Sequence, residues 1–158
     1  LKEKAYYALV RPHLEYTSTV WDPHTVKKCQ QIENVQRTAA RYVTNRWHNR
    51  SSVSDMLNTL GWASLAQRRA QQRLCLFYKI HNGLVAINNE FMTPPVMPTG
   101  TRLSHQYAYQ VPYSSCNYHK FSYFPRTIVD WNALPVSVLN APTLATFRTR
   151  LASVTPTN

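Results

Sequence analysis

The segment from Thr25 to Asn45 reads TVKKCQQIENVQRTAARYVTN and has the most regular pattern in this chain of 158 residues. At 100° per residue its apolar side chains fall in one broad arc of the helical wheel. This arc contains Val26, Cys29, Ile32, Val35, Ala39, Ala40, Tyr42 and Val43. The opposite arc contains Lys27, Gln30, Asn34, Arg37, Arg41 and Asn45. The pattern predicts an amphipathic helix with an apolar side toward a core and a cationic side toward solvent.

The cationic arc predicts a surface that binds nucleic acid. Lys27, Arg37 and Arg41 would neutralise phosphates, and amides such as Asn34 would hydrogen-bond to backbone oxygens. Glu33 lies at the edge of the arc and is the one acid in the segment, so the cations are weakly compensated. The alternative is an ordinary solvated helix face. The chain as a whole favours nucleic acid over a membrane surface, because 18 basic and 7 acidic residues give a net charge of +11.

Helical patterns on both sides of this segment predict a helical domain over residues 1–92. The expected helices span residues 2–11, 12–20, 25–45, 52–60 and 65–82. The first of them should stop or kink at Pro12. Ser52 and Ser64 are the expected N-caps of the last two helices, and Gly83 is the expected residue after the final one.

Residues 93–158 form a predicted C-terminal extension that begins with a proline-rich loop. In residues 103–124 aromatic side chains recur at a spacing of two, which predicts two short strands or an extended loop pinned by its rings. Helical signals return in residues 125–134 and 143–152, and the last few residues are expected to fray. The expected fold is therefore mainly α: a helical bundle, an irregular or short-β aromatic segment, and C-terminal helices.

Composition argues against several other classes of protein. Three glycines leave no phosphate-binding loop of the GxxxxGK or GxGxxG kind. No apolar run approaches 18 residues, so a transmembrane helix is not expected. Three scattered cysteines do not make the framework of a secreted disulfide protein, which favours a reducing compartment. The chain starts at Leu1 with no leader pattern, and we expect it to be a piece of a longer polypeptide.

No catalytic centre and no metal site is predicted. Asp22, Asp55 and Asp130 are the only aspartates, and their positions are typical of caps and ion pairs rather than of a two-metal site. Cys116 and His119, together with His105, could supply three zinc ligands, but a fourth ligand is missing. An ordinary loop is therefore the favoured interpretation of that segment.

Two arginines are expected to lie inside the fold. Arg69 and Arg73 fall in the apolar arc of the helix predicted over residues 65–82. A guanidinium in such a place is more typical of an ion pair with a carboxylate, for which Asp55 and Glu33 are the candidates. The alternative is a contact with phosphate.

Motifs along nearly the whole chain resemble, in order, those of one family. The first half contains Leu9–Tyr16 (LVRPHLEY), Val20–Pro23 (VWDP), Ile32–Arg37 (IENVQR), Ala39–Arg41 (AAR) and Leu60–Trp62 (LGW). The second half contains Phe77–Ile80 (FYKI), Tyr123–Arg126 (YFPR), Trp131-Asn132 with Leu134-Pro135, and Ala141–Leu144 (APTL). Together they resemble the region after the palm in reverse transcriptases of non-LTR retrotransposons, LINEs of the jockey and chicken-repeat type.

The resemblance implies that the chain is the helical thumb and C-terminal extension of an RNA-directed DNA polymerase. In that family the thumb grips the template–primer duplex of RNA and DNA, and the palm supplies the metal-binding aspartates in a Tyr-Ala-Asp-Asp-like turn. This chain has no Asp-Asp pair, so it is expected to hold no cofactor and to be inactive alone, while the parent polymerase uses Mg²⁺. Arg37 and Arg41 fall on the thumb helix. Arg11 falls near the palm junction or in an ion pair with Glu15.

The same resemblance implies an intracellular protein of the nucleus or cytoplasm that contacts nucleic acid and its own palm but no membrane. One alternative is a helical module that docks to the palm or to a host factor. Its contact surface would be Tyr107, Tyr109, Tyr118 and Phe121, although these rings also fit a small core under a long loop. Another alternative is a remnant of a degraded element without a function.

Overall fold

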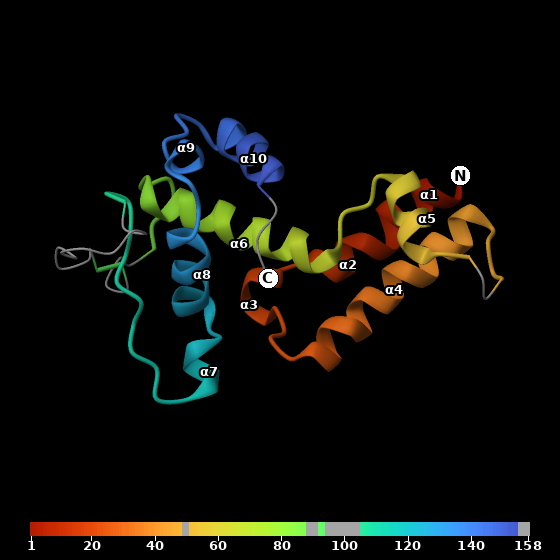
Figure 1. The fold of residues 1–158 in the computed structure, drawn as a ribbon, viewed down its shortest axis with the longest axis horizontal. Helices are drawn as coiled ribbons and strands as arrows, with labels where there is room; N and C mark the ends of the chain where they lie inside the picture. The colour runs from red at the N-terminus through yellow and green to blue at the C-terminus, as the bar shows by residue number, and fades with distance from the viewer. Residues whose placement is uncertain (49–50, 88–91, 94–104, 155–158) are drawn as a thin grey trace. The chain divides into compact units, whose positions relative to one another are not determined.

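The computed structural model of the chain describes residues 1–48, 51–87, 92–93 and 105–154. Within these residues the regular secondary structure is helical, with no strand, which confirms a mainly α fold (Figure 1). The chain divides into two compact units, Leu1–Ala70 (unit 1) and Gln71–Asn158 (unit 2). This division falls inside the helix Leu65–His81. The sequence predicts a domain boundary after residue 92, and that boundary stays a prediction.

Unit 1 combines short helical segments with longer helices. Its elements are α1 (Lys2–Ala5), the π-helical turn η1 (Tyr6–Val10), α2 (Arg11–Glu15), α3 (Ser18–Trp21), α4 (Val26–Thr44), α5 (Val53–Leu60) and the first residues of α6 (Leu65–His81). The helices predicted over residues 25–45, 52–60 and 65–82 are thus confirmed to within one residue at each end.

The predicted helix caps are also present. Ser52 Oγ accepts a hydrogen bond from the Asp55 amide at 3.3 Å, and Ser64 Oγ accepts one from the Gln67 amide at 3.1 Å. Gly83 follows α6 with a φ of +65°, the left-handed conformation that glycine adopts at little steric cost. Polar residues at helix ends satisfy backbone groups locally, which is why these positions could be predicted without knowledge of the packing.

The first predicted helix does not stop at Pro12, because helical backbone continues through this residue, which lies in the first turn of α2. Proline lacks an amide hydrogen, and its ring would clash with the carbonyl four residues earlier in a regular α-helix. The π-turn η1 precedes it, and the Arg11 amide bonds back to the Tyr6 carbonyl, five residues earlier. The helical conformation ends instead at Tyr16, before Thr17 with a φ of +47°.

The core of unit 1 is small and largely aromatic. It consists of Tyr6, Ala40, Met56 and Trp62, with Ala39, Val43, Leu57 and Leu60 packed around them. The rings of Tyr6 and Trp62 stack with their centroids 4.2 Å apart. This stack joins η1 to the turn after α5.

The apolar arc predicted for α4 is too wide. Val26, Val35 and Tyr42 are exposed, at 72%, 42% and 53% of their full surface. Gln36, which lies between Ile32 and Ala40 at helical spacing, is buried instead. The predicted arc covers about 200° of the helix circumference, and the elements packed on α4 cover only its middle.

Unit 2 is built on the rest of α6. Its further elements are α7 (Asn117–Lys120), α8 (Tyr123–Asn132), α9 (Val136–Leu139) and α10 (Leu144–Ser153). Its core contains Leu74, Phe77, Tyr78, Ile80, Met92, Ile128, Trp131, Leu134, Val138, Leu139, Ala141, Phe147 and Leu151. The helices predicted at residues 125–134 and 143–152 correspond to α8 and α10, and both pack against α6 in this core.

The aromatic segment forms no strand in residues 105–124, while residues 103–104 lie outside the described part of the chain. One side chain takes the place of a pairing strand. Asn132 Oδ1 accepts from the Tyr109 amide at 3.0 Å, and Asn132 Nδ2 donates to the Tyr109 carbonyl at 2.7 Å. Trp131 Nε1 donates to the Tyr107 carbonyl at 2.9 Å. An irregular loop is thus seen in residues 105–116, whereas α7 covers residues 117–120 and α8 begins at Tyr123.

Arg69 and Arg73 are buried, and both pair with carboxylates, but not with the predicted ones. Arg69 Nε lies 2.7 Å from Asp22 Oδ1, and Arg73 Nη2 lies 2.6 Å from Asp130 Oδ2. Glu33 instead accepts from the backbone amide of Ala66 at the start of α6, at 2.8 Å. The partner acids are distant in the chain, so helical periodicity could not identify them.

Loss of the Asp22 carboxylate should destabilise the protein strongly. The Arg69 side chain is fully buried and that of Asp22 nearly so. Asp22→Asn would leave a buried cation without a counter-charge, at a cost of about 3–5 kcal/mol of unfolding free energy. Urea unfolding measures this cost. The exposed Asp55 at the start of α5 is the matched control, because Asp55→Asn should cost no more than about 1 kcal/mol. Equal losses would contradict the prediction.

His81 is half-buried at the end of α6 among aromatic rings. Its Nδ1 lies 2.5 Å from the Tyr109 hydroxyl, and its ring packs against those of Tyr107 and Trp131. Burial lowers the pKa of His81 below its usual 6.5. The folded protein therefore favours the neutral imidazole.

This lowered pKa predicts a loss of stability in mild acid. The unfolded chain binds a proton at His81 near its usual pKa of 6.5, whereas the folded chain binds it only at lower pH. The unfolding free energy should therefore be highest above that pH and should fall as the pH drops toward the folded-state pKa. Urea unfolding at a series of pH values measures the slope. His81→Gln should flatten the slope in this window, and an unchanged slope would contradict the assignment.

Candidate nucleic-acid interface

Lys27, Asn34, Arg37 and Arg41 are all exposed on α4, and we call them the α4 cationic face. At 1.5 Å per residue, Lys27 and Arg41 lie about 21 Å apart along the helix axis. A nucleic-acid duplex carries a phosphate about every 3.4 Å along each strand, so this length spans about six phosphates of one strand. The face is thus long enough to contact several phosphates at once.

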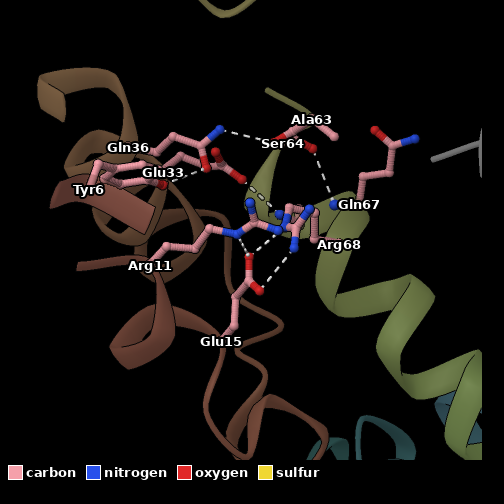
Figure 2. Close-up of polar contacts among 10 residues, drawn as sticks. Tyr6, Arg11, Glu15, Glu33, Gln36, Ala63, Ser64, Gln67 and Arg68 are labelled. Carbon is pink, nitrogen blue, oxygen red and sulfur yellow. Dashed lines mark hydrogen bonds and ion pairs between the residues drawn. The ribbon is translucent and has the colours of Figure 1, made fainter. Parts of the chain in front are cut away.

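The opposite side of α4 fixes the rotation of the helix (Figure 2). Gln36 is buried, donates to the Ala63 carbonyl at 2.9 Å and accepts from the Tyr6 hydroxyl at 3.3 Å. Burial raises the pKa of Tyr6 to about 12, so this hydroxyl stays protonated at neutral pH. Glu33 binds the amide of Ala66. These contacts hold α4 with its cations turned outward.

Gln36 is the residue of this site that the sequence analysis missed. It lies four residues after Ile32 and four before Ala40, so helical spacing alone places it on the core side. A polar residue at such a position needs hydrogen-bond partners inside the fold, and here Tyr6 and Ala63 provide them.

Three acidic residues of unit 1 bind groups outside the α4 cationic face. Glu3 accepts from Trp62 Nε1 at 3.2 Å, Glu33 binds the start of α6, and Asp22 binds Arg69. Among the described residues no carboxylate forms an ion pair with Lys27, Arg37 or Arg41. Glu90 lies outside the described residues. The positive charge of this face is therefore left largely uncompensated.

Arg11, the fifth predicted contact residue, lies in a different cluster. From the sequence, Arg11 is expected either near the palm junction or in an ion pair with Glu15. The structure shows the ion pair, with Arg11 Nε 3.0 Å from Glu15 Oε1. Arg68 binds the same carboxylate through Nε and, at 3.0 Å, through Nη2 (Figure 2). The Arg11 guanidinium also lies 4.9 Å from the ring centroid of Tyr7. Its contact with nucleic acid stays a prediction, and these structural contacts do not favour it.

The rings of the alternative docking surface do not form one exposed patch. Tyr107 and Tyr109 are half-buried and pack against the core of unit 2, as the small-core interpretation predicts. Tyr118 on α7 is 88% exposed. Phe121 is half-buried.

The described residues contain no group of three histidine, cysteine, aspartate or glutamate side chains placed to hold a metal ion. Cys116 is exposed and reduced, and His119 Nδ1 lies 2.9 Å from Ser114 Oγ. Among the same residues, no helix is both long enough and apolar enough to cross a lipid bilayer.

Comparisons of the chain with protein-family models, with curated proteins and with solved structures gave no match. The resemblance to retrotransposon reverse transcriptases therefore stays a prediction. The function of the site has to be inferred from its own geometry and charge.

The orientation of α4 should depend on Gln36. Gln36→Leu keeps the volume similar but leaves the Ala63 carbonyl without its hydrogen bond, which should cost about 1–3 kcal/mol. Thermal unfolding measures the loss. Gln30→Leu, at an exposed position of the same helix, is the control and should change stability by less than about 0.5 kcal/mol. A Gln36→Leu variant as stable as the control would show that these hydrogen bonds do not hold the helix.

Proposed function

We propose that the α4 cationic face binds the phosphate backbone of a nucleic-acid duplex. The observation that supports this most directly is an exposed row of cations, about 21 Å long, with no carboxylate paired to it among the described residues. With the sequence resemblance, this favours the thumb and C-terminal part of a retrotransposon reverse transcriptase. The duplex would then be a template–primer of RNA and DNA.

Binding of this kind is electrostatic and independent of base sequence. Lys27, Arg37 and Arg41 would displace condensed counterions from the phosphates, and Asn34 would donate hydrogen bonds to backbone oxygens. The helix presents no pattern that would distinguish one base from another. A polymerase thumb needs this property, because it must move along every sequence that is copied.

The catalytic chemistry would belong to the parent protein. Under this proposal the palm of the same polypeptide supplies the metal-binding aspartates and Mg²⁺, and this chain is the non-catalytic part that holds the duplex. The proposed location is the nucleus or cytoplasm, where template RNA is present.

The proposal predicts a strong salt dependence of duplex binding. With the three cations of the α4 cationic face in contact, the slope of log affinity against log salt should be near −3, or roughly one and a half decades between 50 and 200 mM salt. Arg37→Ala/Arg41→Ala should make the slope less steep by about two, because two phosphate contacts are lost. Fluorescence anisotropy with a labelled RNA–DNA hybrid measures both quantities.

The matched control removes the same charge elsewhere. Lys4 and Lys120 are exposed on α1 and α7 and do not belong to the α4 cationic face, so Lys4→Ala/Lys120→Ala should leave the slope within about one of the wild type. Equal affinities and equal slopes for the two double variants would overturn the proposal. Salt-insensitive binding to a palm fragment, without binding to the hybrid, would favour the docking alternative.

A further inference from the structure

Unit 1 carries an apolar groove on a different side of α4 from its cations. The groove has a volume of about 620 Å³ and lies between α4 and the segment formed by α1 and η1. Leu9 and Val10 line one wall, Val35, Ala39 and Tyr42 line the other, and Trp47 also lines it. We call this the α1–α4 groove.

The apolar side chains in this groove are more exposed than those of a covered core. Leu9 is 69% exposed, Trp47 54% and Tyr42 53%. Single exposed apolar residues are common on proteins, but a contiguous set in one depression marks an interaction site. Val35 and Tyr42, which are exposed residues of the apolar arc predicted for α4, therefore lie in this groove.

The shape of the groove fits a third helix. Lys2 contacts Tyr42, and Tyr6 contacts Gln36, so the two walls run antiparallel. The α4 wall extends from Gln31 to Tyr42, about 17 Å, and the other wall from Lys2 to Val10, about 12 Å. An amphipathic helix of two to three turns has this length, and its apolar stripe would meet aliphatic side chains on both walls.

The charge at the groove indicates which helix it would bind. The Lys2 ammonium lies at the groove, donates to the Tyr42 carbonyl at 3.2 Å and sits 4.6 Å from the Tyr42 ring centroid. The other polar residues that line the groove are the neutral Gln31, Asn34 and Thr38. No acidic residue lines it in the described part of the chain, and Arg37 and Arg41 lie on the same helix. A partner with acidic flanks would complement this charge.

We propose that the α1–α4 groove binds a protein helix whose apolar stripe is flanked by glutamate or aspartate. The apolar stripe would cover the groove residues, and the acidic flank would pair with Lys2. The three cations proposed to bind phosphate, Lys27, Arg37 and Arg41, do not line the groove, although Asn34 of the α4 cationic face does.

A synthetic peptide tests the proposal on the whole chain. The probe is a helical peptide of about 14 residues with leucine at i, i+3, i+4 and i+7 and glutamate at the flanking positions. Its control keeps the leucines and replaces every glutamate with lysine. Calorimetric titration, with Trp47 fluorescence as a second readout, should show at least about tenfold tighter binding of the acidic peptide.

Variants of exposed residues locate the binding site without disturbing the core. Leu9→Glu/Val35→Glu should weaken binding of the acidic peptide at least about tenfold, because it places charge on both walls. Val20→Glu/Val26→Glu makes the same charge change at residues that are 85% and 72% exposed and do not line the groove. This control should bind as the wild type does. Circular dichroism confirms that both variants fold.

Several results would overturn the proposal. Equal binding of the acidic and basic peptides would show that Lys2 does not select an acidic partner. Binding of neither peptide would show that the groove does not bind a helix. Equal weakening by both double variants would place the peptide elsewhere. A dimer of the chain that Leu9→Glu/Val35→Glu dissociates would make a second copy the occupant. Loss of RNA–DNA hybrid binding in this variant, with no effect on peptide binding, would assign the groove to nucleic acid.

Discussion

A buried guanidinium requires a carboxylate beside it, and this chain has 7 acidic residues against 18 basic ones. Asp22 pairs with the fully buried Arg69, and Asp130 pairs with Arg73. Glu15 serves two arginines at once. Asp22 and Glu15 are thereby withdrawn from the surface, whereas the Asp130 side chain stays 37% exposed. The cationic surface of α4 is therefore a consequence of how the interior is held together, as well as of the number of basic residues.

The rotation of α4 about its own axis determines which of its residues pack inside, which face solvent and which line the groove. Gln36 and Glu33 bind elements packed on the inner side. Arg37 and Arg41 then face solvent, while Val35 and Tyr42 line the α1–α4 groove. A single helix thus separates a polar surface suited to phosphates from an apolar surface suited to a helix. Asn34 belongs to both surfaces.

Local features of the fold could be predicted from the sequence, whereas distant partners could not. The helices at 25–45, 52–60 and 65–82, with their caps at Ser52 and Ser64, depend on residues a few positions apart. The burial of Arg69 follows from periodicity too, but its partner Asp22 comes from another part of the chain. The exposure of the α4 cations agrees with the periodicity, while the edges of its apolar arc depend on neighbours that no helical wheel contains. The absence of a strand in residues 105–124 also involves a distant residue. The Asn132 side chain makes the hydrogen bonds to the Tyr109 backbone that a neighbouring strand would make.

The π-turn before Pro12 also sets the angular phase of the first helical segment. In a regular α-helix, residues five apart are offset by about 140° around the axis. In η1 the Arg11 amide bonds directly back to the Tyr6 carbonyl, which brings the two residues one above the other. The Tyr6 ring stacks on Trp62, and the Arg11 guanidinium pairs with Glu15. Deleting one residue from η1 would leave the two side chains four residues apart in a regular α-helix, about 40° around the axis and still on one side. The turn therefore holds one extra residue without changing which side of the segment the residues before and after it occupy.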